Sequence, residues 1–504
     1  MLSIHHTVSL VDFPDYLGLN GGLVLGSIVE QLHPLYHAKS TAMIGLSKRL
    51  MSVGSIIAQN ILDGGYTGNF YAVNPNSEKV YNNIHAYPSL SHIPEDIDLA
   101  IIVTPSRVVP EVMQDCVDNN VKTAILISAG FSEIRTPEGK ELEEQIVKIA
   151  RKGGLRFTGG NCNGMSSVSV SIHALLSPVR PDFGNVGIIT QGGSPGVAMM
   201  GWTKKHGIGV SRYTNAGNEA DIKIPELIEY YTQDPETKVI MMYLEGIKDG
   251  RGFMNAAKKA TRKKPLLLYK SGISELGKKA AMAHVGALAG STEICEAVFR
   301  QTGVIQAKSI HEMVGIAAAF STQPLPKGRK VGILTIGGGW GVITSDYLGE
   351  AGIEIPPLQE NEIEHLDQYL PPHWSRGNPV DTTDGAFDSK VLSEITETLL
   401  KKENIDGLII IGPGMREAFG KIHPLPEVGE IATQLEVQLA EELEKLLDKY
   451  QKPIITIKIY APDDSPAIEE LKQRGIPVYE TPQDGVAAYT SLVKYYEHQK
   501  RNLQ

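Results

Sequence analysis

The feature that most restricts the fold of this 504-residue chain is a repeated pattern of strand, glycine-rich turn and helix. The stretch "VGIITQGGSPGV" at 186–197 aligns without a gap with "VGILTIGGGWGV" at 331–342. The register continues 145 positions apart, to "HGIGV" at 206–210 and "AGIEI" at 351–355. Each copy predicts a buried strand, a turn, a helix and a second strand. Because such units are right-handed and build parallel sheets, the repeat predicts two successive α/β units.

The two glycine-rich turns are candidate anion sites. A strand that runs through glycines into a helix leaves backbone N–H groups unpaired, and the helix dipole adds positive potential at the same point. Matched turns indicate phosphate binding more strongly than a single one does. The alternative is that two related domains use these glycines only for tight turns. The candidate phosphate-binding residues are Gly192, Gly193 and Ser194 in the first copy and Gly337, Gly338 and Gly339 in the second.

The same alternation of strand and helix begins at Ser40. The stretches "TAMIGLS", "NFYAVNP", "LAIIVTP", "TAILISAGF" and "LRFTGGNCNG" each predict a strand that ends in a loop. In parallel sheets, ligands bind where such loops gather at the carboxyl ends of the strands. A Pro- and Lys-rich linker and a frayed polar tail, "HQKRNLQ", complete the expected organisation. We expect an extension at 1–38, α/β units at 39–180, 184–322 and 331–496, and the linker at 323–330.

Composition narrows the classes of function. The formal net charge is −10 and no long basic run occurs, which argues against a nucleic-acid-binding surface. Cys116, Cys162 and Cys295 are widely spaced, which predicts a reducing compartment with neither a disulfide framework nor a metal site. No basic residue precedes Lys39, which argues against a signal peptide. The apolar stretch at 17–29 is interrupted by Asn20 and four glycines and is too short to span a bilayer. We therefore expect a cytoplasmic protein without a membrane segment.

One histidine, His284, stands among residues that have almost no side chain, in "AMAHVGALAGS" at 281–291. A strand would hold more β-branched residues, and a helix would avoid two glycines. A loop that passes close to another group, and moves, tolerates all of these residues. The segment therefore predicts such a loop.

Several motifs occur in one order along the chain. They are "MIGLSKRLMSVG", "YAVNPN", "ISAGFSE" and "GGNCNGM", then "TQGGSPG", "NAGNEADI", "YLEGIKDG" and "AHVGALAGS", then "TIGGGWG" and "GNPVD". Over about residues 33–495 the chain thereby resembles the α subunit of ADP-forming acyl-CoA (acetyl-CoA) synthetases, in the succinyl-CoA synthetase superfamily. The resemblance implies a Rossmann-like CoA-binding domain followed by two flavodoxin-like domains. It implies the reaction of acid, CoA and ATP to acyl-CoA, ADP and phosphate, through an acyl phosphate and a phosphohistidine.

The resemblance assigns His284 as the phosphorylated residue and Glu245 of "YLEG" as the carboxylate that orients its ring. The chemistry agrees, because neutral imidazole has a free nucleophilic nitrogen. A carboxylate on the other nitrogen selects the tautomer and stabilises the cation that forms on phosphorylation. The alternatives are a packed or turn histidine for His284 and a surface acid in a turn for Glu245.

The resemblance also places a CoA site on the loops of the first unit. Its residues are Gly45, Ser47, Lys48, Val73, Asn74, Pro75, Thr104, Pro105, Ser128, Asn161 and Cys162. Lys48 has the alternative of a solvated surface charge, and Cys162 that of a small buried residue. The chain departs from the family pattern at Gly160 (usually Pro), at Val285 (usually Thr) and at Trp340 (usually Pro). These departures leave the acyl substrate open.

The nucleotide site is expected on another chain. No GxxxxGK[ST] turn occurs, and no stretch remains for an ATP-grasp domain. The resemblance therefore implies a separate ATP-grasp β subunit that brings ADP or ATP with Mg²⁺, in a hetero-oligomer that also uses phosphate, CoA and a small carboxylic acid. Two alternatives are a CoA-binding sensor without phosphoryl transfer and a nicotinamide-dependent dehydrogenase. Against the dehydrogenase, "VNPN" stands where a ribose-binding acid is needed.

Overall fold

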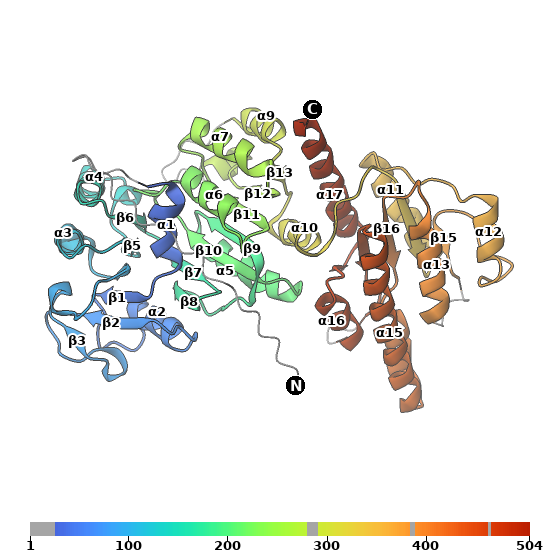
Figure 1. Ribbon diagram of the computed structural model, residues 1–504, viewed down its shortest axis with the longest axis horizontal. Helices are drawn as coiled ribbons and strands as arrows, with labels where there is room; N and C mark the ends of the chain where they lie inside the picture. The colour runs from blue at the N-terminus through green and yellow to red at the C-terminus, as the bar shows by residue number, and fades with distance from the viewer. Residues whose placement is uncertain (1–25, 280–290, 384–388, 462–464, 504) are drawn as a thin grey trace.

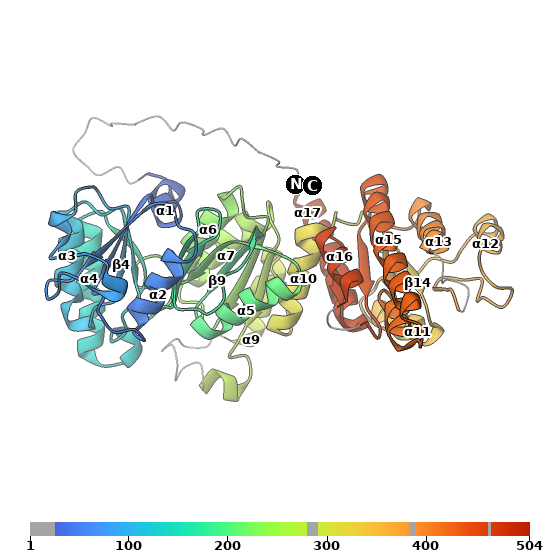
Figure 2. The ribbon, with the colours of Figure 1, turned by 90° about the horizontal axis from the view of Figure 1, so that it is seen from below.

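The computed structural model describes residues 26–279, 291–383, 389–461 and 465–503. These residues form three sheets that follow one another along the molecule in the order of the chain (Figure 1). Helices cover the sheets on both faces (Figure 2).

The first sheet has the strand order β3-β2-β1-β4-β5-β6, with every pair parallel. This is the order of the Rossmann dinucleotide-binding sheet, and the order reverses between β1 and β4. Its strands are β1 (Ser40–Ile44), β2 (Asn69–Val73), β3 (Ala86–Tyr87), β4 (Leu99–Ile102), β5 (Thr123–Leu126) and β6 (Arg156–Gly159). Its helices are α2 (Val53–Leu62), α3 (Val109–Asp118) and α4 (Pro137–Lys152), with short 3₁₀ turns at Tyr81–Asn83, Leu90–His92, Ser106–Val108 and Ser132–Ile134.

The second sheet has the order β13-β12-β11-β9-β10-β7-β8. The five strands from β13 to β10 are parallel and have flavodoxin order, while β7 and β8 add an antiparallel hairpin at one edge. The strands are β7 (Gly164–Ser167), β8 (Ile172–Leu175), β9 (Phe183–Thr190), β10 (Val210–Asn215), β11 (Val239–Leu244), β12 (Leu266–Lys270) and β13 (Ile305–Gln306). The helices are α5 (Gly193–Lys205), α6 (Ile224–Gln233), α7 (Gly250–Thr261), α9 (Thr292–Thr302) and α10 (Ile310–Thr322).

The third sheet, β15-β14-β16-β17-β18, is parallel and also has flavodoxin order. Helices α5 and α11 both contain 13 residues and begin at matched positions of the repeat, which confirms the predicted fold class. The strands are β14 (Val331–Thr335), β15 (Val380–Asp381), β16 (Gly407–Ile411), β17 (Ile454–Ile457) and β18 (Val478–Tyr479). The helices are α11 (Gly338–Glu350), α12 (Glu360–Leu366), α13 (Ser389–Lys401), α14 (Met415–Ile422), α15 (Pro426–Tyr450), α16 (Pro466–Gln473) and α17 (Pro482–Leu503).

A helix, α1 (Ile28–Tyr36), lies within the stretch that the sequence suggested to be an extension. Ser27 caps it in a capping box, and its apolar face, Leu32, Leu35 and Tyr36, is fully buried. The Tyr36 ring stacks on Tyr230 of α6 at 4.5 Å between centroids. The helix is too short to show a clear hydrophobic period, and its contact with α6 stabilises it.

The first sheet ends at Gly159, earlier than the expected unit boundary at 180, because β7 and β8 pair with the second sheet. Asn60 of α2 donates from Nδ2 to the backbone oxygens of Leu175 at 2.9 Å and Ser177 at 2.8 Å. One hydrophobic cluster consequently runs through both units. The first two sheets are therefore held together by a shared core.

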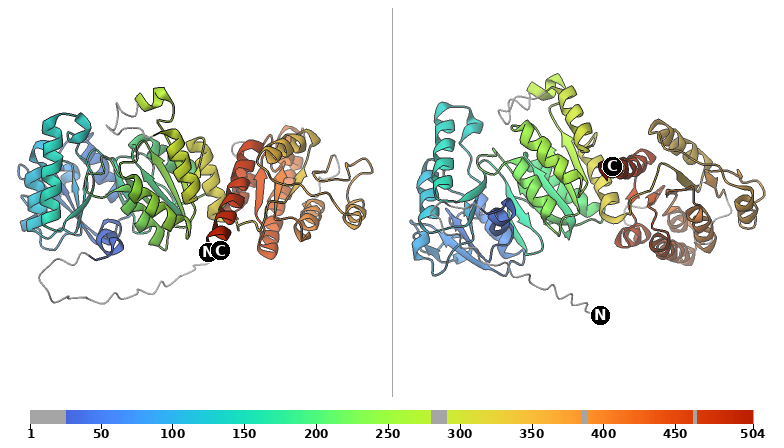
Figure 3. Two further views of the ribbon diagram at one scale, coloured as in Figure 1. Left: turned by 90° about the horizontal axis from the view of Figure 1, so that it is seen from above. Right: turned by 45° about the horizontal axis from the view of Figure 1, so that its top comes forward.

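The expected frayed tail is instead the end of α17, which continues to Leu503. Its Gln499 donates from Nε2 to the backbone oxygen of Thr261 at 2.8 Å, at the end of α7. Helix α17 packs along α10 and α11, and α10 packs on α5. Helices α10 and α17 thus lie between the second and third sheets (Figures 2 and 3). The polar tail is therefore tied to the second unit by hydrogen bonds of His498 and Gln499 to Thr261.

Candidate functional site

The loops after β1 and β2 are tied together at the carboxyl edge of the first sheet. Gly45 N donates to Val73 O at 3.0 Å, and Asn74 Nδ2 donates to Leu46 O at 2.8 Å. Gly45 has φ +97°, and a Cβ there would lie 2.6 Å from Thr104 Cγ2. The positive φ and the close approach of Thr104, in the loop after β4, therefore require glycine at this position.

Thr104, Ser128 and Asn161 continue this edge along the next strands. Ser128 Oγ donates to Thr104 O at 2.5 Å, and Asn161 N donates to Ser128 O at 2.8 Å. Thr104 Oγ1 is buried and has no hydrogen-bond partner within the described part of the chain. Such a group in a native fold calls for an explanation, and a ligand atom is one. The predicted CoA residues at the strand ends thus form one continuous edge at the position where this fold class binds ligands.

Some predicted CoA residues lie farther out on the same loops. Lys48, Pro75 and Pro105 are exposed, and Ser47 is partly exposed. Both interpretations of Lys48, a phosphate contact and a solvated charge, are compatible with this exposure.

Cys162 is buried behind the edge. Its Sγ donates to Leu126 O at 3.3 Å, and burial raises the pKa of the thiol to about 12. A neutral, hydrogen-bonded thiol is a poor nucleophile, which favours the interpretation of a small buried residue.

Glu245 lies against the start of α5. It follows β11, is 6% exposed, and its Oε1 would lie 2.9 Å from a Cβ on Gly192. Tyr243 Cε1 would lie 3.0 Å from the same Cβ, and burial together with the neighbouring Glu245 raises the pKa of the Tyr243 hydroxyl. Gly192 is the N-cap of α5 and has no side chain to satisfy the first-turn N–H groups. The turn therefore combines free backbone donors with a carboxylate at close range.

Asn163 joins the CoA edge to this helix start. Its Nδ2 donates to Gly193 O at 3.3 Å, and its Oδ1 accepts from the Tyr213 hydroxyl at 2.9 Å. Beside it, Asn218 N donates to Gly160 O at 2.9 Å. The loop after β6 in the first sheet thus contacts the loops after β9 and β10 in the second. The predicted CoA residues and the first predicted phosphate turn are brought together.

The second glycine turn begins α11 on the third sheet. A Cβ on Gly338 would lie 2.8 Å from Asp381 Oδ2, at the end of β15. Each copy of the repeat thus has a carboxylate beside its helix start. Because α10 and α17 lie between α5 and α11, Gly337, Gly338 and Gly339 belong to a different part of the molecule from Gly192.

Two of the three departures from the family pattern lie in described segments. Trp340 is partly buried and packs against the apolar cluster of the third sheet. A Cβ on Gly160 would lie 2.8 Å from Phe131 Cδ2, so the Phe131 ring occupies the space of a larger residue. His284 and Val285 lie outside the described residues.

Four polar residues at these sites were not singled out from the sequence: Asn163, Gln191, Glu219 and Asp381. All four stand inside motifs that the sequence analysis quoted, namely "GGNCNGM", "TQGGSPG", "NAGNEADI" and "GNPVD". The motifs could have indicated that these residues have a role, but they do not reveal the contacts. The partners are 28 or more positions away, in the pairs Asn163–Gly193 and Gln191–Glu219. Contacts at that separation depend on the sheet order.

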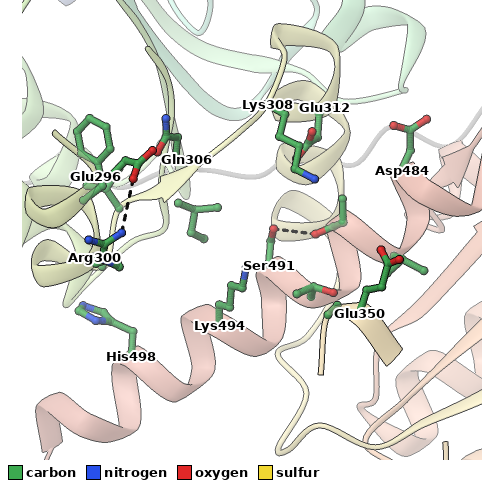
Figure 4. A pocket seen from close by; sticks show the side chains of 18 of the residues that line it. Glu296, Arg300, Gln306, Lys308, Glu312, Glu350, Asp484, Ser491, Lys494 and His498 are labelled. Atoms are coloured by element: carbon green, nitrogen blue, oxygen red, sulfur yellow. Dashed lines mark hydrogen bonds and ion pairs between the residues drawn. The ribbon is translucent and has the colours of Figure 1, made fainter. Parts of the chain in front are cut away.

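A separate cavity of about 780 Å³ lies where α9, β13 and α10 face α11 and α17 (Figure 4). Its lining carries charges of both signs, and Arg300 pairs with Glu296 at 3.8 Å. None of the candidate site residues that the structure describes lines this cavity. The cavity lies at the junction between the second and third units.

The described ranges contain neither a group of metal-ligating side chains nor a helix that could span a membrane. No three His, Cys, Asp or Glu side chains there are grouped to hold a metal ion. No helix among the same residues has the length and apolar character needed to cross a bilayer.

Comparison with protein families defines the class of the molecule. Residues 39–167 match the CoA binding domain, and residues 183–320 match the succinyl-CoA ligase like flavodoxin domain. These two matches cover the first two sheets except β8, and they include the CoA edge and the Gly192 turn. They place the chain among the CoA ligases of the succinyl-CoA ligase type.

Relatives along the whole chain identify the family. The chain is 35% identical over 474 residues to the acetate–CoA ligase [ADP-forming] I subunit alpha of Pyrococcus furiosus, which covers 92% of this chain and 97% of the relative. It is 36% identical to an acetate–CoA ligase [ADP-forming] of Methanocaldococcus jannaschii, over 92% of this chain but 63% of that longer relative. The chain belongs to the α subunits of ADP-forming acyl-CoA synthetases, which confirms the resemblance seen in the sequence.

Two solved structures have the same fold as this chain over more than nine-tenths of its length. The dinucleotide forming acetyl-coenzyme A synthetase 1 of Ca. Korarchaeum cryptofilum, in complex with phosphate and ADP, is 30% identical and has a TM-score of 0.83 over 94% of this chain and 99% of that one. A crystal structure from Pyrococcus horikoshii OT3 is 35% identical, with a TM-score of 0.81 over 93% of this chain and 99% of that one.

Proposed function

We propose that this chain carries out the CoA and acyl-phosphate steps of an ADP-forming acyl-CoA synthetase. Phosphate attacks the acyl-CoA carbonyl, and CoA leaves as the thiol while acyl phosphate forms. The neutral imidazole of His284 then takes the phosphoryl group and releases the carboxylate. A partner transfers that group from the histidine to ADP, which forms ATP and restores the imidazole. The observation that carries this proposal is the contact of Asn163 with Gly193, which joins the CoA edge to the start of α5.

The proposed roles follow from the position of each group. The edge from Gly45 to Asn161 holds CoA, and Thr104 Oγ1 supplies an unsatisfied hydroxyl there. The first-turn N–H groups of α5 bind phosphate oxygens. Glu245 accepts a hydrogen bond from the N–H of one nitrogen of the His284 ring, so the other nitrogen is the nucleophile.

We further propose that the partner is an ATP-grasp β subunit that brings ADP or ATP with Mg²⁺. The Pyrococcus furiosus relative is named a subunit, and the Methanocaldococcus jannaschii relative is longer than this chain. The related structure from Ca. Korarchaeum cryptofilum holds phosphate and ADP. CoA and adenine nucleotides are metabolites of the cytoplasm, where we place the reaction.

Intact-mass measurement tests the function. The purified chain, incubated with acetyl-CoA and phosphate, should gain about 80 Da, which is one phosphoryl group. The adduct should be lost in acid, as expected for a phosphoramidate, and acetate with phosphate should not produce it. An unchanged mass with acetyl-CoA and with a series of larger acyl-CoAs would contradict the proposal.

Gly192→Ala tests whether the space beside Glu245 matters for turnover. The added methyl group would lie 2.9 Å from Glu245 Oε1, so the carboxylate must move while the fold is kept. We expect turnover to fall about 100-fold, because misplacing a catalytic group by about 1 Å has effects of that size. The measurement is the steady-state turnover of acetyl-CoA, with the midpoint of thermal unfolding as a check on folding.

Gly201→Ala, in the same helix α5, is the matched control. The nearest atom to its added methyl group is Val179 Cγ2 at 4.0 Å. We expect unchanged turnover and a gain of about 1 kcal/mol in stability, because alanine is the better helix former. Equal turnover of Gly192→Ala and Gly201→Ala would mean that Gly192 serves the turn alone.

A further inference from the structure

The side chain of Gln191, between β9 and the Gly192 turn, forms hydrogen bonds with the backbone at Glu245 and Gly246. It is 7% exposed. Its Oε1 accepts the N–H of Glu245 at 2.6 Å and the N–H of Gly246 at 3.0 Å. Its Nε2 donates to Gly246 O at 2.8 Å. One amide therefore pairs with three backbone groups of the segment that carries the carboxylate.

Glu219, together with the backbone of Glu245 and Gly246, determines which way this amide points. Glu219 Oε1 accepts from Gln191 Nε2 at 2.7 Å, and its Oε2 accepts from Ile224 N at 3.1 Å, at the start of α6. Glu219 is 3% exposed. An ionised carboxylate only accepts hydrogen bonds, so it keeps the nitrogen of Gln191 on its own side and the oxygen toward Glu245. A flipped amide would set an NH₂ group against two N–H donors.

Lys270 also forms a hydrogen bond with this segment, at the carbonyl of Glu245. Its Nζ donates to Glu245 O at 2.7 Å and to Ser271 O at 2.5 Å. The backbone of Glu245 is thus held at both its N–H and its carbonyl. The backbone that carries the Glu245 carboxylate is therefore held on both sides, while the absence of a side chain at Gly192 leaves room for the carboxylate.

We propose that Gln191, oriented by Glu219, is a positioning residue for phosphoryl transfer and acts only through the Glu245 carboxylate. The inference rests on the proposed function, in which Glu245 orients the phosphorylated histidine. It adds that this orientation depends on a buried pair whose members come from the loops after β9 and β10. A positioning residue of this kind changes the rate of phosphoryl transfer and leaves CoA binding unchanged.

The first variant is Gln191→Met, which keeps the length of the side chain and removes both polar atoms. In the presence of the β subunit, we expect kcat for ATP formation to fall about 100-fold, as for a displaced catalytic group, with an unchanged KM for acetyl-CoA. Phosphorylation of the chain, followed by intact mass after rapid mixing, should slow by the same factor. A Gln191→Met chain with wild-type kcat would overturn the inference.

The matched control is Gln323→Met. Gln323 is also 7% exposed, its Nε2 donates to Gly475 O at 2.6 Å, and its Oε1 accepts from Ile454 N at 2.8 Å. It therefore has the same chemistry but joins the second and third units. We expect a comparable loss of thermal stability with unchanged kcat. If both variants lose kcat equally, Gln191 has only a structural role and the inference is wrong.

A double-mutant cycle separates the inference from the function beneath it. If Gln191 acts through Glu245, the double variant Gln191→Met, Glu245→Gln should be no slower than Glu245→Gln alone. Multiplied losses would overturn the inference and leave the function intact. A Glu245→Gln chain that is phosphorylated at the wild-type rate would instead contradict the proposed role of Glu245. Should Gln191→Met fail to fold, Glu219→Gln serves in its place, with kcat expected to fall about tenfold because the amide is less firmly oriented.

Discussion

His284→Ala is expected to abolish phosphorylation of the chain and to lower turnover by about 10⁴-fold or more, the size of effect seen when a catalytic nucleophile is removed. Alanine has no atom that can accept a phosphoryl group, so the route from acyl phosphate to ADP is interrupted. Binding of CoA should be unchanged, because its proposed residues lie on the loops of the first sheet. The measurements are labelling with radioactive phosphate in the presence of acetyl-CoA, and calorimetric titration with CoA.

His423→Ala is the control for this experiment. His423 is exposed on the third unit, where its Nδ1 accepts from Leu425 N at 3.2 Å. Its loss should change neither labelling nor turnover. Labelling that survives His284→Ala would place the phosphorylated residue elsewhere in the chain.

The second large effect concerns the partner. The purified chain, given acetyl-CoA, phosphate and ADP, should form labelled acyl phosphate and a labelled histidine but release no ATP. An ATP-grasp β subunit of the family, added to the same mixture, should start ATP release. The physical reason is that the three sheets account for one CoA-binding unit and two flavodoxin-like units, and the sequence has no GxxxxGK[ST] phosphate cradle.

The controls for the partner experiment use the same two proteins. The β subunit alone should release no ATP from acetyl-CoA, phosphate and ADP. The β subunit mixed with the His284→Ala chain should also release none, because the phosphoryl carrier is missing. Rapid ATP release by the chain alone would overturn the proposed division of labour.

Local sequence patterns predicted the three α/β units because buried strands that end in glycine, followed by amphipathic helices, are signals within short windows. Three segments were assigned differently by the structure. Helix α1, the β7–β8 hairpin and the end of α17 all owe their order to another unit, through Tyr230, strand β10 and Thr261. Propensity summed over a short window contains no information on such distant partners.

For the candidate site, the strand–turn–helix pattern in the sequence singled out the glycine turns, and the family resemblance proposed Glu245 and the strand-end residues of the CoA edge. The assembly of these parts came only from the folded chain. Asn163 meets Gly193, and Gln191 holds Glu245 from 54 positions away, because sheet order brings the loops after β6, β9 and β11 to one place. Strand order is set by packing of whole elements and not by neighbours along the chain, so these contacts could be found only in three dimensions.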